Sequence, residues 1–253
     1  MAHPHPELHA DRTGTGPLLA LVHGFTQTRK CWGPVAGDLA PDHELILVDA
    51  PGHGLSNAVA ADLATGGELI ADAAGPATYV GYSMGGRFAL HSALARPDVV
   101  ERLVLIGATA GLESADERAA RITDDDQRAA RIEEIGVDAF LDEWLALPLF
   151  AGLDEATACR AERRENTAAG LASSLRLAGT GTQIPTWHRL GELQMPVLVV
   201  AGALDTKFAA LGDRLVESIG RNADLALIDD AGHTAHLEQP ERFLATLRGW
   251  LRR

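Results

Sequence analysis

The sequence predicts an α/β fold, in which a mostly parallel sheet is covered by helices on both faces and one helical segment is inserted. Three observations predict it. Short runs of Val, Leu and Ile recur without polar alternation, which is typical of parallel strands buried on both faces. Segments with helical periodicity separate these runs. One long stretch, residues 110–189, has no convincing strand pattern.

The predicted strands lie in two groups, before and after that stretch. They are Leu18–Val22, Glu44–Val48, Ala77–Gly81, Arg102–Ile106, Pro196–Ala201 and Asp224–Ile228. The stretch itself is rich in Ala, Arg and Glu and carries apolar residues at helical spacing, such as Phe140, Leu141, Trp144 and Leu145. We therefore expect a core of residues 1–109 and 190–253 and a helical cap of residues 110–189. A cap at this place covers the edge where α/β sheets bind ligands.

Composition excludes several classes of function. The net charge of −13 argues against nucleic acid as a partner, because phosphates require a basic face. No apolar stretch approaches the ~20 residues that span a membrane, and the polar segment Met1 to Asp11 has no signal core. Two cysteines, Cys31 and Cys159, are too few for a disulfide framework. We expect a cytoplasmic protein, either a monomer or a small homo-oligomer, with no cofactor and no metal.

A Gly-x-Ser-x-Gly motif is the first candidate for catalysis. Residues Gly81 to Gly85 read Gly-Tyr-Ser-Met-Gly and lie between a predicted strand and a helix-like segment. In this context the glycines allow a sharp turn that exposes the hydroxyl of Ser83. The N-terminus of the following helix favours negative charge beside that hydroxyl. We therefore expect Ser83 to be the reactive serine.

A reactive serine needs a histidine that accepts its proton and a carboxylate that orients the histidine. In folds of this type the chain order is serine, acid, histidine. Asp205 and His233 satisfy this order, and each follows a predicted strand. We therefore expect all three side chains at the carboxyl ends of parallel strands, where open α/β sheets place their sites.

Other polar residues near this set have alternative explanations. Asp229 and Asp230 share the loop of His233 and are typical of solvated turns. His236 is expected at the surface or at a helix entry, and it is an alternative to His233. His53 follows the second predicted strand in a tight Pro-Gly-His-Gly loop, which we expect it to shape.

Two backbone N–H groups are candidates for stabilising an oxyanion. The segment Val22-His23-Gly24-Phe25 follows the first predicted strand, and its glycine permits a turn that directs the Phe25 N–H at the site. The Met84 N–H lies next to the serine. Donors of this kind are worth about 10²–10³ in rate. His23 is expected to be structural in its loop.

Four segments together resemble the α/β-hydrolase superfamily. They are Val22 to Phe25, Asp49 to Gly54, Gly81 to Gly86 and Ala231 to His233. The resemblance implies an α/β-hydrolase fold, but one scaffold serves many chemistries. The reaction therefore has to be inferred from finer features.

One such feature is an arginine beside the serine. Arg87 stands four residues after Ser83, on the same face of the predicted helix, where a plain esterase has no evident need of a cation. Further distinctive segments are Glu117 to Arg121, Phe140 to Leu141 with Trp144, Pro148 to Phe150, Arg164 to Asn166, Gly179 to Gln183 and Asp205 to Phe208. Together these features resemble the 2-succinyl-6-hydroxy-2,4-cyclohexadiene-1-carboxylate synthases of menaquinone biosynthesis, and the resemblance covers nearly the whole chain from Leu21 onward.

The resemblance implies a lyase that eliminates pyruvate from 2-succinyl-5-enolpyruvyl-6-hydroxy-3-cyclohexene-1-carboxylate. This small-molecule anionic substrate carries three carboxylates. The resemblance assigns substrate binding to Arg87, Arg121 and Arg164, with aromatic contacts from Tyr82 and Trp144. Arginine is the best-matched partner for a buried carboxylate, so inward-facing arginines would let an acidic chain hold this substrate. Ser83 would then act as a base rather than as an acyl acceptor.

Two other classes of function remain open. A small-molecule serine hydrolase, acting on an ester or a C–C bond, would share Ser83, Asp205 and His233 but would tolerate the loss of Arg87 and Arg121. A non-catalytic binding protein of the same fold would be expected to have an incomplete triad.

Overall fold

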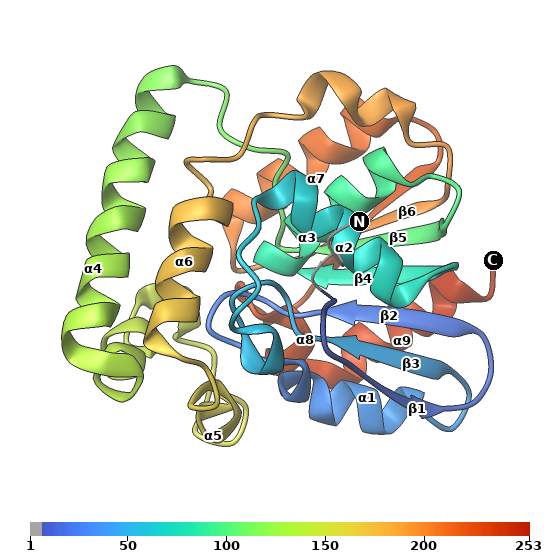
Figure 1. Cartoon of the computed structure of the whole chain (residues 1–253). Coiled ribbons are helices and arrows are strands. Elements are labelled where there is room, and N and C mark those ends of the chain that lie inside the picture. Colours follow the sequence, from blue (N-terminus) through green and yellow to red (C-terminus); the bar gives the residue numbers. More distant parts are fainter. Residues whose placement is uncertain (1–6) are drawn as a thin grey trace, which may run out of the picture.

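The computed structural model describes residues 7–253, and a seven-stranded sheet forms its centre (Figure 1). The strand order is β1-β3-β2-β4-β5-β6-β7. The edge strand β1 is antiparallel to β3, and every other neighbouring pair is parallel. The strands are β1 Ala10–Gly14, β2 Leu18–Val22, β3 Glu44–Val48, β4 Ala77–Tyr82, β5 Val100–Ile106, β6 Val197–Gly202 and β7 Ala223–Ile228.

The six predicted strands are confirmed, and β1 was not predicted. Its sequence, Ala-Asp-Arg-Thr-Gly, is polar and its residues are half-buried or exposed. An edge strand that is solvated in this way lacks the apolar run that marks the central strands. Most of the N-terminal segment Met1 to Asp11 precedes β1, and residues 1–6 lie outside the described part of the chain.

Side chains alternate between the two faces of each central strand, so the sheet has an apolar layer on each side. On β2, Ala20 and Val22 belong to one layer and Leu19 and Leu21 to the other. The first layer is covered by α2 Leu63–Ala74, α3 Met84–Ala95 and α7 Thr206–Ile219. The second layer is covered by α1 Gly33–Leu39, α8 Ala235–Glu238 and α9 Pro240–Leu251.

The segment between β5 and β6 is helical, and we keep the name cap for residues 110–189. Its helices are α4 Ala115–Leu145, α5 Arg160–Arg163 and α6 Ala168–Ala178, with a short 3₁₀ turn, η3, at Pro148–Phe150. In α4 the backbone leaves helical geometry at Gly136, where φ is 79°. Helices α4 and α6 lie side by side and face the arrowheads of β2, β3 and β4 (Figure 1).

Three further 3₁₀ turns lie in the connecting segments, at η1 Arg29–Trp32, η2 Gly54–Ser56 and η4 Trp187–Glu192.

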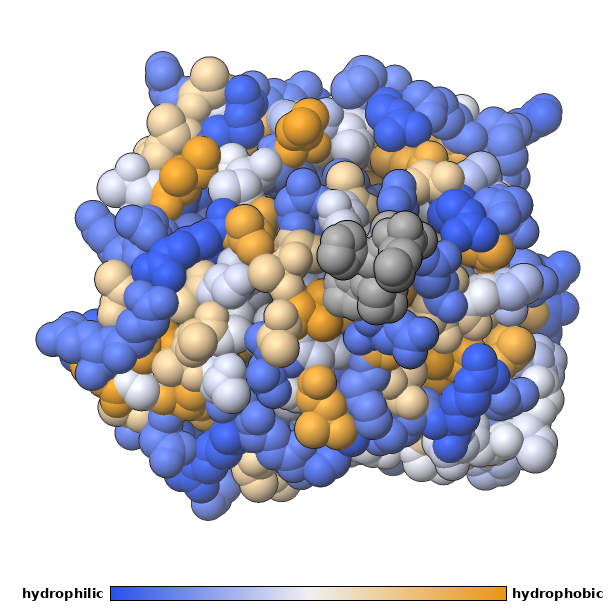
Figure 2. Space-filling view, viewed as in Figure 1, coloured by the Kyte–Doolittle hydropathy of each residue, from blue (hydrophilic) through white to orange (hydrophobic). Residues whose placement is uncertain are grey.

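The face in Figure 2 is largely hydrophilic, with apolar residues in small separate groups. None of the helices between residues 7 and 253 has both the length and the hydropathy needed to cross a bilayer. Cys31 in η1 and Cys159 in the cap are free and buried, and they share a small apolar cluster.

Candidate active site

Ser83 forms a sharp turn between the end of β4 and the start of α3. Its backbone has φ 52° and ψ −110°, a conformation that costs of order 1–3 kcal/mol for a residue with a side chain. The turn requires glycine on both sides of the serine, because neighbouring backbone leaves no room for a side chain there. A Cβ on Gly81 would overlap the Gly85 carbonyl, and a Cβ on Gly85 would overlap the Val22 carbonyl. This geometry exposes the Ser83 hydroxyl, as the motif predicts.

Ser83, His233 and Asp205 form a hydrogen-bonded chain. His233 Nε2 lies 3.3 Å from Ser83 Oγ, and His233 Nδ1 lies 2.8 Å from Asp205 Oδ2. Asp205 follows β6 and also accepts a hydrogen bond from the Phe208 N–H, at the start of α7, at 3.2 Å. Burial raises the pKa of Asp205, but the hydrogen bonds from His233 and the Phe208 N–H outweigh it and lower the pKa below its usual value. The carboxylate is therefore ionised at neutral pH and can orient the imidazole.

The alternative residues lie elsewhere. Asp229 and Asp230 are exposed, and Asp230 pairs with Arg242 at 2.8 Å. His236 lies at the start of α8, as one of the two expectations had it, but it is buried rather than at the surface: it is 1% exposed, and its ring packs against Trp32 and Tyr82. Burial lowers its pKa to about 3, so His236 is neutral.

The loop after β2 carries the Phe25 N–H, and two neutral histidines brace it. Thr26 has a φ of 65°, and its N–H donates to His53 Nε2 at 3.3 Å. His23 Nε2 accepts the Ala50 N–H at 3.1 Å. Burial lowers the pKa of His53 to about 3 and also lowers the pKa of His23, which keeps both acceptor nitrogens free of protons. Both histidines hold loops, as expected.

The cap also holds this loop. The Asn166 amide donates to Thr26 O at 2.7 Å, while its Oδ1 accepts the Gly54 N–H at 2.9 Å. Arg163 donates to Thr26 Oγ1 and to Phe25 O. The loop with the Phe25 N–H is therefore fixed from both the core and the cap. The Met84 N–H, at the first position of α3, has no intrahelical partner and lies beside Ser83.

A cavity of about 870 Å³ lies between the sheet and the cap. Ser83, Asp205 and His233 all line it. Its apolar lining includes Tyr82 and Trp144, the two aromatic residues expected at the site, together with Phe25, Met84, Phe150 and Phe208. The Trp144 ring packs edge-on against Phe25, with centroids 5.3 Å apart. This volume suits a small organic molecule rather than a polymer.

Two of the three expected arginines line the cavity, and each is anchored by one donor. Arg87 is 7% exposed, and its Nη1 donates to Ala178 O at 2.8 Å. Arg121 Nε donates to Asp125 Oδ1 at 2.8 Å. Within residues 7–253 their remaining N–H groups have no hydrogen-bond partner. Burial lowers the pKa of Arg87 to about 10, so the guanidinium is still protonated at neutral pH.

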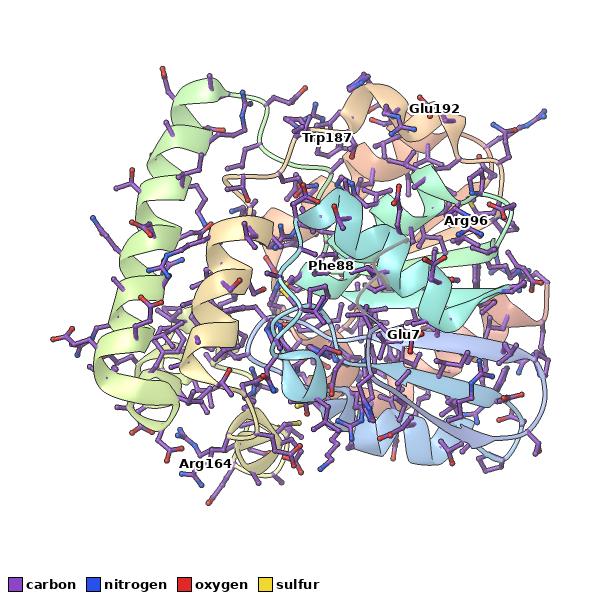
Figure 3. All side chains as sticks on the ribbon, in the orientation of Figure 1. Glu7, Phe88, Arg96, Arg164, Trp187 and Glu192 are labelled. Carbon is purple, nitrogen blue, oxygen red and sulfur yellow. The ribbon has the colours of Figure 1, made fainter. Side chains whose placement is uncertain are left out.

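Arg164, the third expected arginine, is not at the cavity. It ends the α5 turn, its side chain is 52% exposed and it pairs with Asp138 at 2.7 Å. Figure 3 shows it at the outer end of α5, directed away from the sheet. The neighbouring Arg163 lines the cavity instead, is 1% exposed, and has a buried Nη2 with no partner among the described residues. The spacing of adjacent arginines in a one-turn helix could not distinguish the inward from the outward residue.

Further charges lie around the cavity that the sequence did not single out as site residues. Lys207, Arg214, Glu113 and Glu117 belong to its lining. Arg214 pairs with Glu113 at 2.6 Å, so part of this charge is neutralised. Lys207 lies within the segment Asp205 to Phe208, whose resemblance to the family pointed to this region. Among residues 7–253, no cluster of three or more His, Cys, Asp or Glu could hold a metal ion.

Known proteins resemble this chain in sequence and in structure. The alpha/beta hydrolase family matches residues 19–246. A Yersinia pseudotuberculosis (serotype O:1b, strain IP 31758) 2-succinyl-6-hydroxy-2,4-cyclohexadiene-1-carboxylate synthase is 32% identical and covers 98% of this chain and 92% of its own. A Bacillus subtilis (strain 168) protein, given the same name provisionally, is 34% identical over 88% of this chain and 85% of its own.

The solved structure of MenH from S. aureus has a TM-score of 0.89 and is 28% identical, covering 96% of this chain and 98% of that one. The fold match and the sequence matches both extend over nearly the full chain, so they include the cap as well as the sheet. The chain belongs to the alpha/beta hydrolase family and, within it, to the 2-succinyl-6-hydroxy-2,4-cyclohexadiene-1-carboxylate synthases.

Proposed function

We propose that this chain is a carbon–oxygen lyase of menaquinone biosynthesis. It eliminates pyruvate from 2-succinyl-5-enolpyruvyl-6-hydroxy-3-cyclohexene-1-carboxylate and gives 2-succinyl-6-hydroxy-2,4-cyclohexadiene-1-carboxylate. The observation that carries this proposal is the set of cavity arginines around Ser83. Each guanidinium uses only some of its N–H groups in hydrogen bonds to the protein, which leaves further N–H groups for ligand carboxylates. This holds for Arg87, Arg121 and Arg163.

The charge balance of the cavity supports an anionic substrate. Burying a carboxylate costs several kcal/mol unless a cation pairs with it, and arginine pairs with carboxylates through two parallel hydrogen bonds. We assign the three substrate carboxylates to Arg87, Arg121 and Arg163, with Arg163 taking the role that the sequence suggested for Arg164. The rings of Tyr82 and Trp144 form apolar walls for the substrate.

The triad supplies the proton transfers. His233 Nε2 takes the proton of the Ser83 hydroxyl, and the Ser83 oxygen removes a proton from the substrate ring. The electron pair of that C–H bond moves through the conjugated ring system, and the C–O bond to the enolpyruvyl group breaks. The leaving enolate takes a proton from His233 and becomes pyruvate, which restores both residues. Asp205 stabilises the imidazolium that forms in between.

Negative charge develops on the succinyl carbonyl oxygen during this step. We assign its stabilisation to the N–H groups of Phe25 and Met84, since preorganised donors lower the barrier where charge develops. Because no acyl group is transferred, Ser83 stays free of covalent substrate. Isolation of a covalent intermediate on Ser83 with this substrate would contradict the mechanism.

The test is pyruvate release from the enolpyruvyl substrate, generated in situ by an enzyme that makes it and followed by a pyruvate-specific coupled assay. We expect wild type to release pyruvate well above background and Ser83→Ala to lose at least about 10³-fold in rate. Ser174→Ala is the matched control, because Ser174 lines the same cavity but contacts Met84 Sδ at 3.5 Å rather than His233. Wild type that turns over simple esters and releases no pyruvate would instead indicate a serine hydrolase.

A further inference from the structure

Three consecutive aspartates on α4 have different surroundings. Asp124 pairs with Arg128 and Asp126 with Arg176, each at 2.9 Å, and the two aspartate side chains are 46% and 66% exposed. The side chain of Asp125 between them is only 3% exposed. Its carboxylate packs so closely against Gly179, at the end of α6, that a Cβ on Gly179 would overlap Oδ2. Gly179 lines the cavity, so Asp125 lies directly behind the cavity wall.

The buried carboxylate of Asp125 is only half satisfied. Its Oδ1 accepts the hydrogen bond from Arg121 Nε at 2.8 Å and lies 3.9 Å from Arg128 Nη1. Its Oδ2 is buried and has no hydrogen-bond partner within residues 7–253. Packing of the cap does not require such a group, because an apolar residue of similar size is often at least as stable as a buried ion pair. Packing alone therefore does not explain why a carboxylate is buried at this position.

Asp125 lies close to the two cavity arginines, Arg87 and Arg121. Arg121 precedes Asp125 by one helical turn, so both side chains lie on the same face of α4. The bond to Asp125 occupies Nε and leaves both terminal amino groups of Arg121 for the cavity. Burial lowers the pKa of Arg87, the charge of Arg121 lowers it further, and the charge of Asp125 opposes both. Arg87 and Arg121 line the same cavity, where like charges repel each other, and the carboxylate of Asp125 lies behind its wall at Gly179.

We propose that Asp125 is a positioning residue for the carboxylate-binding arginines. It orients Arg121 towards the cavity and offsets the repulsion between Arg121 and Arg87 while the cavity holds no anion. The inference rests on the function proposed above, since it takes Arg121 to bind a substrate carboxylate. Asp125 does not line the cavity, so its effect on the substrate passes through Arg121.

Asp125→Asn tests this, because it keeps the shape of the side chain and removes its charge. We expect KM for the enolpyruvyl substrate to rise about tenfold, the equivalent of about 1.4 kcal/mol, with kcat changed by no more than about twofold because the triad is untouched. Asp126→Asn is the matched control, since it removes the charge of the neighbouring carboxylate, which is 66% exposed and pairs with Arg176 of α6. We expect it to leave both constants within about twofold.

A double-mutant cycle with Arg121→Leu separates positioning from a structural role. In the Arg121→Leu background, Asp125→Asn should change KM by no more than about twofold, since its partner is gone. A tenfold rise that persists there, or an equal fall in kcat, would overturn the proposal. If Asp125→Asn does not fold, the apolar pair Arg121→Leu/Asp125→Leu replaces it and must match the KM of Arg121→Leu.

The same assays distinguish a failure of the proposed function from a failure of the positioning role of Asp125. Wild type that releases no pyruvate refutes the proposed function before any variant is compared. Wild type that releases pyruvate, with an unchanged KM in Asp125→Asn, refutes only the positioning role of Asp125.

Discussion

Replacing Arg163 by glutamine removes a guanidinium that contacts both the cavity and the loop behind the Phe25 N–H. Arg163 is 1% exposed and donates to Ala158 O at 2.8 Å, to Phe25 O at 3.4 Å and to Thr26 Oγ1. Its Nη2 is buried and has no partner among the described residues, and we assign the guanidinium to a substrate carboxylate because Arg163 lines the cavity. We therefore expect the variant to lose binding and also to disturb the Phe25 N–H, which we propose as an oxyanion donor.

The magnitude follows from these contacts. A hydrogen bond to a charged group contributes about 1.5–3 kcal/mol, so the loss of the carboxylate contact alone lowers kcat/KM by roughly 10- to 150-fold. Displacement of the Phe25 N–H adds to this loss through kcat. We expect Arg163→Gln to lose about 10²-fold or more in kcat/KM, with KM raised and kcat lowered.

Arg164→Gln is the matched control, one residue further along the chain. Its side chain is 52% exposed and pairs with Asp138 on the surface, and exposed pairs contribute about 0–1 kcal/mol to stability. We expect its kcat/KM to stay within about twofold of wild type. Steady-state pyruvate release measures both variants, and a thermal unfolding midpoint confirms that each is folded. An Arg164→Gln loss as large as that of Arg163→Gln would refute the placement of the third arginine.

Two further predictions concern the loop behind the cavity and the acid of the triad. Asn166→Ala removes the amide that holds Thr26 O, so we expect kcat to fall about tenfold with KM within about twofold, measured by pyruvate release; a rise in KM alone would count against this role. The lowered pKa of Asp205 means that its carboxylate stabilises the fold above its unfolded pKa of about 3.9, and that this contribution is lost as the pH falls through the folded value. In urea unfolding, the difference in free energy of unfolding between wild type and Asp205→Asn should therefore shrink below about pH 4. A difference that stays constant from about pH 6 to about pH 3 would contradict the ionised state of Asp205.

The central strands and the turn at Ser83 could be predicted because local sequence determines them. A strand buried on both faces must be apolar throughout, as β2 is, and the turn at Ser83 needs glycines where the backbone of β2 approaches. The edge strand β1 has no such requirement, because its pairing with β3 uses backbone groups while its polar side chains face solvent. Its five residues therefore carry no apolar pattern.

Residues whose role depends on helix orientation could not be resolved from spacing. Arg163 and Arg164 differ by about 100° around a single turn, and only the packing of α5 on the core decides which one faces inward. The same holds for Asp125, since three adjacent aspartates are equivalent in sequence while the contact between α4 and α6 buries one of them. The segment Arg164 to Asn166 indicated the region of the third arginine, whereas no motif pointed to Asp125, and tertiary contacts selected the residue in both cases.

The hydrogen bonds from Asn166 and Arg163 to the Phe25–Thr26 loop make the cap part of the support of the active site, and not only its cover. In a scaffold of this kind, exchanging the cap between enzymes is an obvious route to new substrate specificity. Here such an exchange would remove the donors that contact Thr26, whose φ is 65°, and the backbone that carries the proposed oxyanion donor would lose its contacts with the cap. If the Phe25 N–H acts as we propose, the cap affects both substrate choice and transition-state stabilisation, and a graft of residues 110–189 would have to bring a compatible loop after β2 with it.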